Sequence, residues 1–386
     1  MEILTLLFPL FLIGLSCLII WRSSDGFEIA SDFLGRKLPL GIKGASLNAI
    51  ASSMPEFLTT IFFLFYLNDS DGFSGGLGVT SGSAMFNLLI IPAIAVILVF
   101  RVRKGEKIAL NKDVLAREGI VLVLSQIIFI AFLFNGELNG LKGLIMVLIY
   151  TLYLFLLFRI AKRRGTADPG YKTPVDENQH NFWIKILSLD LTHAVLNGRK
   201  LNSGIAWLLL IVSTGFMTAG TWMLVLGTDL FGERTNIPLI FVAVVLSAAA
   251  TSIPDTIISI KDARKGNYDD AVSNALGSNI FDIAFALGLP ILLYNLIYGK
   301  TISLGEYDLG FTKELWVFLV MATIVALTIM ISGRYFTKTK AYLLLSIYAI
   351  FLVFIGTQVH GNKIHFGQHI FQFLTNIADA IGKLVN

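Results

Sequence analysis

Two short polar motifs inside apolar runs are the residues of this chain best suited to chemistry. The first is SSMPE at residues 52–56, and the second is TSIPD at residues 251–255. Each contains a hydroxyl residue, a serine, an apolar residue, a proline and a carboxylate, in that order. A carboxylate at membrane depth is costly, so such a residue is a functional-site candidate by default. Because the pattern occurs in both halves of the chain, chance is a poor explanation for it.

Each motif is followed by a second polar cluster, GSAMFN at residues 82–87 and GSNIFD at residues 277–282. Glycine, serine and phenylalanine recur at matching places in the two clusters. The last position differs, because Asn87 stands where the second cluster has Asp282. The two halves are therefore similar but differ in charge at this position.

The side chains of these motifs are rich in oxygen. Those that could contribute oxygen atoms to a common site are Ser52, Ser53, Glu56, Ser83, Asn87, Thr251, Ser252, Asp255, Ser278, Asn279 and Asp282. Pro55 and Pro254 also interrupt their helices and release backbone carbonyls. Hard cations such as calcium prefer ligand sets made only of oxygen. Carboxylates that face one another in a low dielectric need cations or protons to neutralise them. The pattern therefore predicts a site that exchanges one set of cations for another.

Each of these residues, taken alone, also has a simpler structural explanation. A proline in a spanning helix often makes only a kink, and a hydroxyl before it often bonds its own helix. Small residues such as Gly82 and Ala248 serve close helix packing. His365 and His369 are spaced like metal ligands, but solvated tail residues are the better interpretation. The repetition of both motifs in the two halves favours a functional site over these explanations.

Composition identifies an integral membrane protein. The 386 residues are 55% hydrophobic and only 15% charged, with a mean hydropathy of +0.75, whereas soluble domains carry about 25% charged residues. The single cysteine, Cys17, excludes a disulfide within the chain. No zinc spacing, P-loop or dinucleotide fingerprint is present, so we expect no cofactor and no enzymatic activity. The basic residues lie at helix ends, which argues against nucleic-acid binding, and no obligate protein partner is evident.

Ten segments are long and apolar enough to span a membrane. They are 3–21, 44–67, 78–100, 117–135, 139–161, 204–228, 237–261, 269–298, 312–332 and 340–358. The first lacks the basic start and the cleavage site of a signal peptide, so we interpret it as a spanning helix. The predicted organisation is a five-helix unit at 1–161, a polar linker at 162–203, a second five-helix unit at 204–358 and a tail at 359–386. Residues 182–196 and the tail are amphipathic, which is typical of segments on the membrane surface.

The basic residues predict the orientation of the chain. With ten spans, 24 of the 30 lysines and arginines fall on one side, which is therefore expected to be cytoplasmic. Both termini are then outside, and the long linker is cytoplasmic. Because each half has an odd number of helices, the second half enters the membrane with the opposite orientation. The expected fold is all-α, with ten transmembrane helices arranged as two inverted five-helix repeats.

At these motifs the sequence resembles the cation/calcium exchanger superfamily, and most closely the potassium-dependent sodium/calcium exchangers. The resemblance spans the two repeats, roughly residues 41–98 and 240–293. It implies that Glu56 and Asp255 are the central calcium ligands and that Asn87 and Asp282 complete the centre. Further implied roles are sodium-site oxygens from Ser52, Ser53, Ser83, Thr251, Ser252 and Ser278, and backbone carbonyls from Ala49 and Ala248. An aspartate at 282 is associated with potassium dependence in that family.

Two features depart from the family pattern. Ala84 stands where many members have asparagine, although the potassium-dependent branch also has alanine there. The short linker leaves no room for the large cytoplasmic regulatory domains of the animal members. The family also contains proton- and magnesium-coupled exchangers, so these couplings stay open.

The expected function is a secondary antiporter that exchanges calcium for sodium by alternating access, with potassium co-transport left open. Helices 1 and 6 are expected to slide against a core of helices 2, 3, 7 and 8. The partners are calcium, sodium and potassium ions and the lipid bilayer, in a prokaryotic inner membrane. A calcium/proton or magnesium exchanger of the same fold is the main alternative. A channel and an intramembrane protease using Asp255 and Asp282 fit less well, because a protease motif of the Gly-x-Gly-Asp kind is missing.

Overall fold

The computed structural model describes residues 2–36, 44–67, 70–102, 107–134, 137–164, 182–359 and 365–385. Within these residues, eight helices are long and apolar enough to cross a membrane, or up to ten if each of two bent helix pairs is one span. The chain is therefore a helical, multi-pass membrane protein, as predicted. The α1 and α10 helices extend well beyond their predicted ends at residues 21 and 228.

The elements of the first half begin with a long helix and then alternate between helical and wider, π-helical segments. They are α1 (Glu2–Leu34), η1 (Gly44–Asn48), α2 (Ala49–Ser52), α3 (Met54–Leu67), α4 (Ser70–Met85), η2 (Phe86–Ile90), α5 (Ile91–Val102), α6 (Lys112–Phe134), β1 (Glu137–Leu138) and α7 (Gly140–Arg164).

After two short linker helices, the second half repeats this alternation of helical and π-helical segments, with an added α11 before η3, a strand placed one connection earlier and the tail helix α18. Its elements are α8 (Phe182–Leu187), α9 (Leu191–Leu196), α10 (Ser203–Thr235), α11 (Leu239–Val242), η3 (Ala243–Ser247), α12 (Ala248–Thr251), α13 (Ile253–Lys265), α14 (Tyr268–Ile280), η4 (Phe281–Ala286), α15 (Gly288–Tyr298), β2 (Ile302–Ser303), α16 (Glu306–Ile331), α17 (Lys338–Val359) and α18 (His365–Val385).

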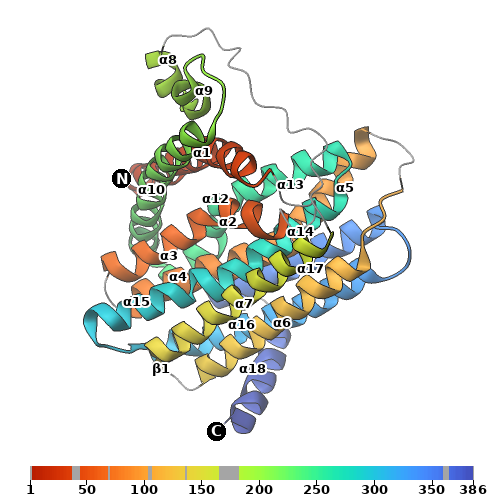
Figure 1. Cartoon of the computed structure of the whole chain (residues 1–386). Helices are drawn as coiled ribbons and strands as arrows, with labels where there is room; N and C mark the ends of the chain where they lie inside the picture. Colours follow the sequence, from red (N-terminus) through yellow and green to blue (C-terminus); the bar gives the residue numbers. More distant parts are fainter. Residues whose placement is uncertain are drawn as a thin grey trace.

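The α1 and α10 helices form a pair at one side of the bundle (Figure 1). Each is 33 residues long. Glycines of α10 allow the close approach, because a Cβ at Gly227 would lie 2.9 Å from the side chain of Ile13, and one at Gly220 would lie 3.0 Å from Ile19. In a membrane, small residues of this kind let helix backbones pack closely.

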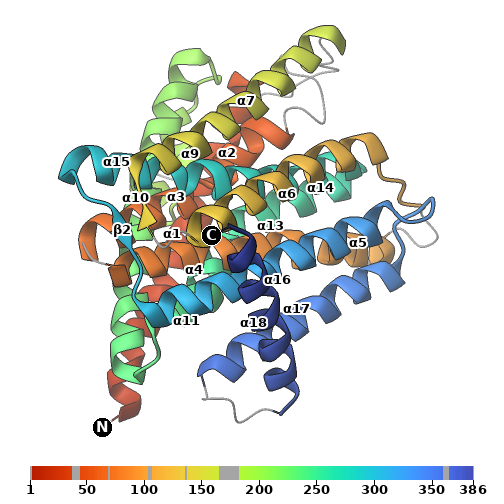
Figure 2. The ribbon, with the colours of Figure 1, turned by 90° about the horizontal axis from the view of Figure 1, so that it is seen from below.

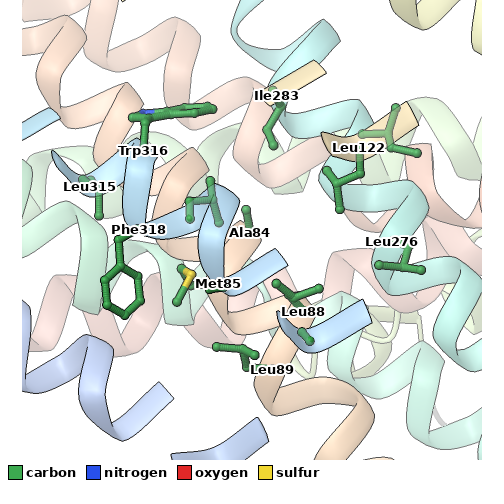
Figure 3. Close-up of a cluster of buried hydrophobic side chains, with 14 of the residues drawn as sticks. Ala84, Met85, Leu88, Leu89, Leu122, Leu276, Ile283, Leu315, Trp316 and Phe318 are labelled. Carbon is green, nitrogen blue, oxygen red and sulfur yellow. The ribbon is translucent and has the colours of Figure 1, made fainter. Parts of the chain in front are cut away.

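The core of the remaining bundle lies between α4, α6, α14 and α16. Figure 3 shows part of it, where Met85, Leu122, Leu276 and Trp316 come together from these four helices. The ring of Trp316 is fully buried and lies 4.4 Å from the ring of Phe129, centroid to centroid. Lipid tails are as apolar as these side chains, so their close contacts rather than removal of water hold the helices together.

Two contacts between connections show which loops share an end of the bundle. The strands β1 and β2 pair antiparallel, with Glu137 opposite Ser303, which joins the α6–α7 and α15–α16 connections. The all-α prediction missed this short pair. At the other end, the backbone N–H of Phe336 donates to the carbonyl of Ile108 at 2.8 Å, which joins the α5–α6 and α16–α17 connections.

The linker contains two short helices, and the tail contains one long helix. Linker residues 165–181 lie outside the described residues, whereas 182–196 form α8 and α9 rather than one helix. Asp190 begins α9, because its carboxylate accepts from the backbone N–H of His193 at 3.3 Å. The tail helix α18 packs against α16 and α17, in the foreground of Figure 2, and buries Leu374 against the bundle. The side chains of His360, His365 and His369 lie outside the described part of the chain.

Candidate functional site

Both proline motifs break a helix. The segment up to Ser52 and the helix that begins at Met54 meet at 45°, and the corresponding segments around Ser252 meet at 41°. Proline has no N–H and its ring displaces the preceding turn, which explains a bend at each position. A π-helical segment, η1 or η3, comes directly before each short helix that ends at a break. Such wider turns are frequent at functional sites.

The carbonyls of Ala49 and Ala248 lie at the two breaks. Each accepts a backbone N–H at 3.0 Å, from Ser53 and Ser252 respectively. Thr251 also donates its hydroxyl to the carbonyl of Ala248, at 3.2 Å. The hydroxyl of Thr251 is thus bonded to its own helix, as the simpler explanation of a hydroxyl before a proline anticipates. The hydroxyl of Ser52 likewise donates to the carbonyl of Ala49, at 3.3 Å. Each carbonyl has two lone pairs and accepts two hydrogen bonds here, so an ion that contacts it would replace the hydroxyl.

The close crossing of α4 over η3 and α12 depends on Gly82. A Cβ at this position would lie 2.1 Å from the carbonyl oxygen of Val244 and 2.6 Å from the Cβ of Ala248. Only glycine allows the two backbones to approach this closely. Because of this crossing, Ser83, the next residue, lies beside the motif of the second half.

Replacing Gly82 by alanine is therefore expected to push α4 away from η3 and to impair transport. Overpacking of this kind costs about 1–3 kcal/mol, so the purified variant should unfold at a lower temperature. Gly356→Ala is the matched control, because a Cβ there meets no atom within 4 Å. Equal unfolding temperatures and transport rates for the two variants would contradict this role of Gly82.

Ser83 and Ser278 make the same pair of contacts in mirrored form. The hydroxyl of Ser83 donates to Glu56 Oε1 at 3.0 Å and lies 2.9 Å from the Oγ of Ser252. The hydroxyl of Ser278 donates to Asp255 Oδ1 at 2.7 Å and lies 3.3 Å from the Oγ of Ser52. Each serine thus contacts the carboxylate of its own half and the serine of the other half. The two motifs form one cluster rather than two separate ones.

The mirror relation fails at Asn87 and Asp282. Asn87 donates its amide to Asp255 Oδ2 at 2.9 Å. At the related position, Asp282 and Glu56 are two carboxylates that repel each other. Ser83 gives Asp282 a long hydrogen bond, 3.4 Å to Oδ2. The first pair is satisfied within the protein, whereas the second needs a positive charge.

Several oxygen atoms of the cluster have no hydrogen-bond partner among the described residues. Three of them are Oε2 of Glu56, Oδ1 of Asp282 and Oδ1 of Asn87, and Oγ of Ser53 is another. All four side chains are fully buried, and a buried acceptor without a donor is costly. None of the hydrogen bonds that the described residues give to Glu56, Asp255 or Asp282 comes from a lysine or arginine. The arrangement suits a cation that would contact these oxygens.

A cation here would need ligands of several kinds. Among the residues that the structure describes, no group of three or more acidic, histidine or cysteine side chains is close enough to hold a metal ion alone. Hydroxyl, amide and carboxylate groups belong to one hydrogen-bonded cluster, and calcium accepts such mixed oxygen sets. The fully buried residues of this cluster that the motifs predicted are Ser52, Ser53, Glu56, Ser83, Asn87, Thr251, Ser252, Asp255, Ser278 and Asp282.

Two asparagines differ from expectation. The amide of Asn279 donates to the backbone carbonyl of Ala84 at 2.9 Å rather than to a carboxylate of the cluster. Asn274 was not predicted, yet its amide donates to Asp255 Oδ1 at 3.3 Å. It lies one helical turn before Ser278 on the same face of α14, so the spacing of four residues could have identified it.

Comparison with known proteins agrees with these observations. The family described as "Sodium/calcium exchanger protein" matches residues 8–159 and 205–357, which leaves out the whole linker and the tail. The sodium/calcium exchanger MaX1 of Methanosarcina acetivorans is 26% identical over 91% of this chain and 98% of its own length. The inner membrane protein YrbG of Escherichia coli is 26% identical over 82% of this chain and 87% of its own length.

Human sodium/potassium/calcium exchanger 4 is 34% identical, but the match covers only 36% of this chain and 23% of that longer protein. Two solved structures share the fold. The H⁺/Ca²⁺ exchanger CAX has a TM-score of 0.66 at 13% identity, covering 98% of this chain and 91% of that one. The sodium-calcium exchanger NCX_Mj has a TM-score of 0.53 at 19% identity, covering 89% of this chain and 97% of that one.

Proposed function

Because this chain belongs to the sodium/calcium exchanger family, we propose that it is a secondary antiporter that exchanges calcium for sodium across a membrane by alternating access. One observation carries the proposal. Three buried carboxylates, Glu56, Asp255 and Asp282, come from both halves of the chain. Ser83 donates to both Glu56 and Asp282, Ser278 donates to Asp255, and within the described residues no basic side chain is hydrogen-bonded to any of the three. The protein is accordingly a transporter and not an enzyme.

The charge of the cluster explains why exchange is the expected activity. Buried carboxylates need compensating positive charge, and one calcium ion or several sodium ions can supply it. One calcium ion together with several sodium ions would leave the three carboxylates with excess positive charge, although one calcium ion and one monovalent ion would balance them. Calcium and the full set of sodium ions therefore compete for the cluster, and the vacated site must be refilled before the protein changes conformation.

The proposed architecture is ten transmembrane helices in two inverted five-helix repeats, with each bent pair counted as one span. The mirrored contacts of Ser83 and Ser278 support it, as does the repeated order of helical and π-helical segments. The proposed orientation puts both termini outside and the linker in the cytoplasm, because that side carries most of the basic residues. A prokaryotic inner membrane is the proposed location, which the name of the Escherichia coli relative supports.

Alternating access would come from α1 and α10 sliding against the core helices. At one end, Lys261 of α13 joins α1 to this core, with its Nζ 3.1 Å from Asp25 Oδ1 and 2.9 Å from Glu28 Oε2. These ion pairs are partly exposed, so each contributes only about 0–1 kcal/mol. Such weak contacts can break during each transport cycle.

A covalent link between α1 and α13 is therefore expected to stop exchange. In a Cys17→Ser background, Glu28→Cys and Lys261→Cys would be joined by a cleavable bifunctional thiol reagent, and calcium uptake should fall at least about tenfold, because the conformational step is blocked. Cleavage of the reagent should restore it. The control pair, Asp262→Cys with Lys265→Cys, links two positions within α13 and should leave uptake unchanged. Full activity of the cross-linked α1–α13 pair would contradict the sliding of α1.

Proton coupling is the second candidate, because protons also neutralise buried carboxylates and the fold is shared with an H⁺/Ca²⁺ exchanger. Replacing a sodium gradient by a proton gradient in proteoliposomes distinguishes sodium coupling from proton coupling. Vesicles loaded with sodium at equal pH are expected to take up calcium-45, whereas acid-loaded vesicles without sodium are not. Uptake that follows the proton gradient alone would overturn sodium coupling.

Potassium co-transport and magnesium transport are tested in the same vesicles. Adding potassium on the calcium side should raise uptake if potassium moves with calcium. Excess magnesium should compete poorly, because magnesium requires small octahedral sites and loses its water reluctantly. Strong inhibition by magnesium would favour a broader divalent-cation exchanger.

A further inference from the structure

A long apolar groove runs between α6 and α16, away from the carboxylate cluster. It has a volume of about 610 Å³, and its lining includes Ala116, Gly119 and Val123 of α6 with Ile324, Leu327 and Ile331 of α16. Leu327 closes its floor, because a Cβ at Gly119 would lie 2.6 Å from the Cδ1 of Leu327. The side chains of Ile120 and Ile324 are half exposed at its walls. The groove therefore opens toward the surrounding membrane.

The length of the groove matches one leaflet of a bilayer. Its α6 wall runs from Leu115 to Leu124, which is about 14 Å at the rise of an α-helix. The hydrocarbon core of a bilayer is about 30 Å thick, or about 15 Å for each leaflet. Both ends of the wall lie within spanning helices. A groove of this depth fits a single acyl chain.

Positive charge gathers at one end of the groove. Ser332 lines that end, and Lys340 donates its ammonium to the carbonyls of Ser332 and, at 3.0 Å, of Tyr335. Lys112 is close enough to Lys340 for the two charges to repel. Within the described residues, neither lysine has a carboxylate within 4 Å. Two lysines of like charge without an acidic partner favour an anion between them.

We propose that this groove binds an anionic phospholipid, with one acyl chain between α6 and α16 and its phosphate beside Lys112 and Lys340. Basic sites between transmembrane helices on the cytoplasmic side attract anionic headgroups. The lysines lie at the end that the distribution of basic residues assigns to the cytoplasm. A second copy of this chain would bury the same apolar walls but would leave the two lysines unpaired, so a lipid fits better. The inference is independent of which ions the protein exchanges.

Native mass spectrometry of the full chain, purified in detergent, tests the proposal directly. Phosphatidylglycerol and phosphatidylcholine with identical acyl chains would be titrated separately. Each lysine near an anionic lipid favours binding about fivefold, so phosphatidylglycerol should bind roughly 25-fold more tightly. The double variant Lys112→Gln with Lys340→Gln should bind both lipids equally. Because Lys340 also holds the end of α16, replacing it could disturb the structure there. The single variant Lys112→Gln is therefore measured too, and its affinity for phosphatidylglycerol should fall about fivefold.

Matched controls separate the groove from the rest of the surface. Lys338→Gln should keep the preference, because the ammonium of Lys338 lies over the ring of Phe100, whereas that of Lys340 is bonded to Ser332 at the end of the groove. Ala116→Trp should fill the groove and weaken the binding of both lipids. Ile127→Trp changes an exposed position of α6 outside the groove and should leave the binding of both lipids unchanged. Inorganic phosphate should not displace the lipid at millimolar concentration.

Three results would overturn the proposal. One is equal binding of the two lipids by the unmodified protein. Another is a preference that survives loss of Lys112 and Lys340. The last is a dimer in detergent whose cross-links place the groove of one copy against the other.

Discussion

Replacing Glu56 by glutamine, or Asp255 by asparagine, is expected to abolish calcium–sodium exchange while the protein still folds and inserts. Each substitution keeps the size of the side chain and removes one negative charge from the fully buried cluster. Removing one partner of a buried charge pair costs about 3–5 kcal/mol, which is roughly two to three and a half orders of magnitude in affinity. The measurement is sodium-driven calcium-45 uptake into proteoliposomes at equal amounts of inserted protein.

Glu118 provides a control for this experiment. It is also a buried carboxylate in a spanning helix, but it accepts hydrogen bonds from Arg117, at 2.5 Å, and from Tyr153. Its charge is therefore compensated within the protein, and Glu118→Gln should keep exchange within a few-fold of normal. Near-normal uptake in Glu56→Gln or Asp255→Asn would contradict the assignment of these carboxylates as the central ion ligands. A complete loss in Glu118→Gln would show that buried charge matters for a reason other than ion binding.

Changing Asp282 to asparagine is expected to alter which ions are coupled rather than to stop calcium exchange. The variant removes the carboxylate that repels Glu56 and leaves a site with one negative charge fewer. Fewer monovalent ions are then needed to neutralise it, so the sodium dependence of uptake should become less steep. Any potassium dependence should disappear. Both are measured as calcium-45 uptake against sodium and potassium concentration.

The exchanged double variant, Asn87→Asp with Asp282→Asn, separates charge count from charge position. Asn87 now donates to Asp255, so an aspartate at 87 would repel Asp255 as Asp282 repels Glu56. If the number of charges determines the coupling, the double variant should regain a steep sodium dependence. A shallow dependence in the double variant, with normal calcium affinity, would show instead that the position of the third carboxylate is decisive.

The main features of the site were predictable from the sequence, because the residues of the motifs determine the local backbone geometry. A proline in a spanning helix must bend it, and the 45° and 41° bends lie where Pro55 and Pro254 predicted them. The repeated serine–glycine context predicted that both halves contribute to one place, which the mirrored contacts of Ser83 and Ser278 confirm. The roles of these residues in binding ions stay predictions.

Other features depend on tertiary contacts that a single sequence does not specify. Gly82 was correctly interpreted as a small residue that serves close helix packing, but its partner was not predicted, because the 2.1 Å approach to Val244 is a property of two helices distant in sequence. Asn274 was missed because it lies outside the repeated motif. The β1–β2 pair has two residues in each strand, too few for any alternation to be recognised. Glu118 was missed because its partner Tyr153 is on a different helix.

The ends of α1 and α10 were also underestimated. Both helices continue past their apolar stretches into polar residues, where hydropathy gives no signal. In α1 the polar continuation carries Asp25 and Glu28, which bind Lys261. Partners on another helix stabilise these residues in helical form, and local hydrophobicity cannot reveal them.

The central claim is that calcium and sodium compete for one cluster built from both halves of the chain. Equilibrium binding of calcium-45 to the purified protein, titrated with sodium at constant ionic strength, tests it most directly. We expect bound calcium to fall with a Hill coefficient for sodium above one, and Asp255→Asn to bind no calcium in the same range. Calcium binding that is insensitive to sodium, or that persists in Asp255→Asn, would contradict a single shared site.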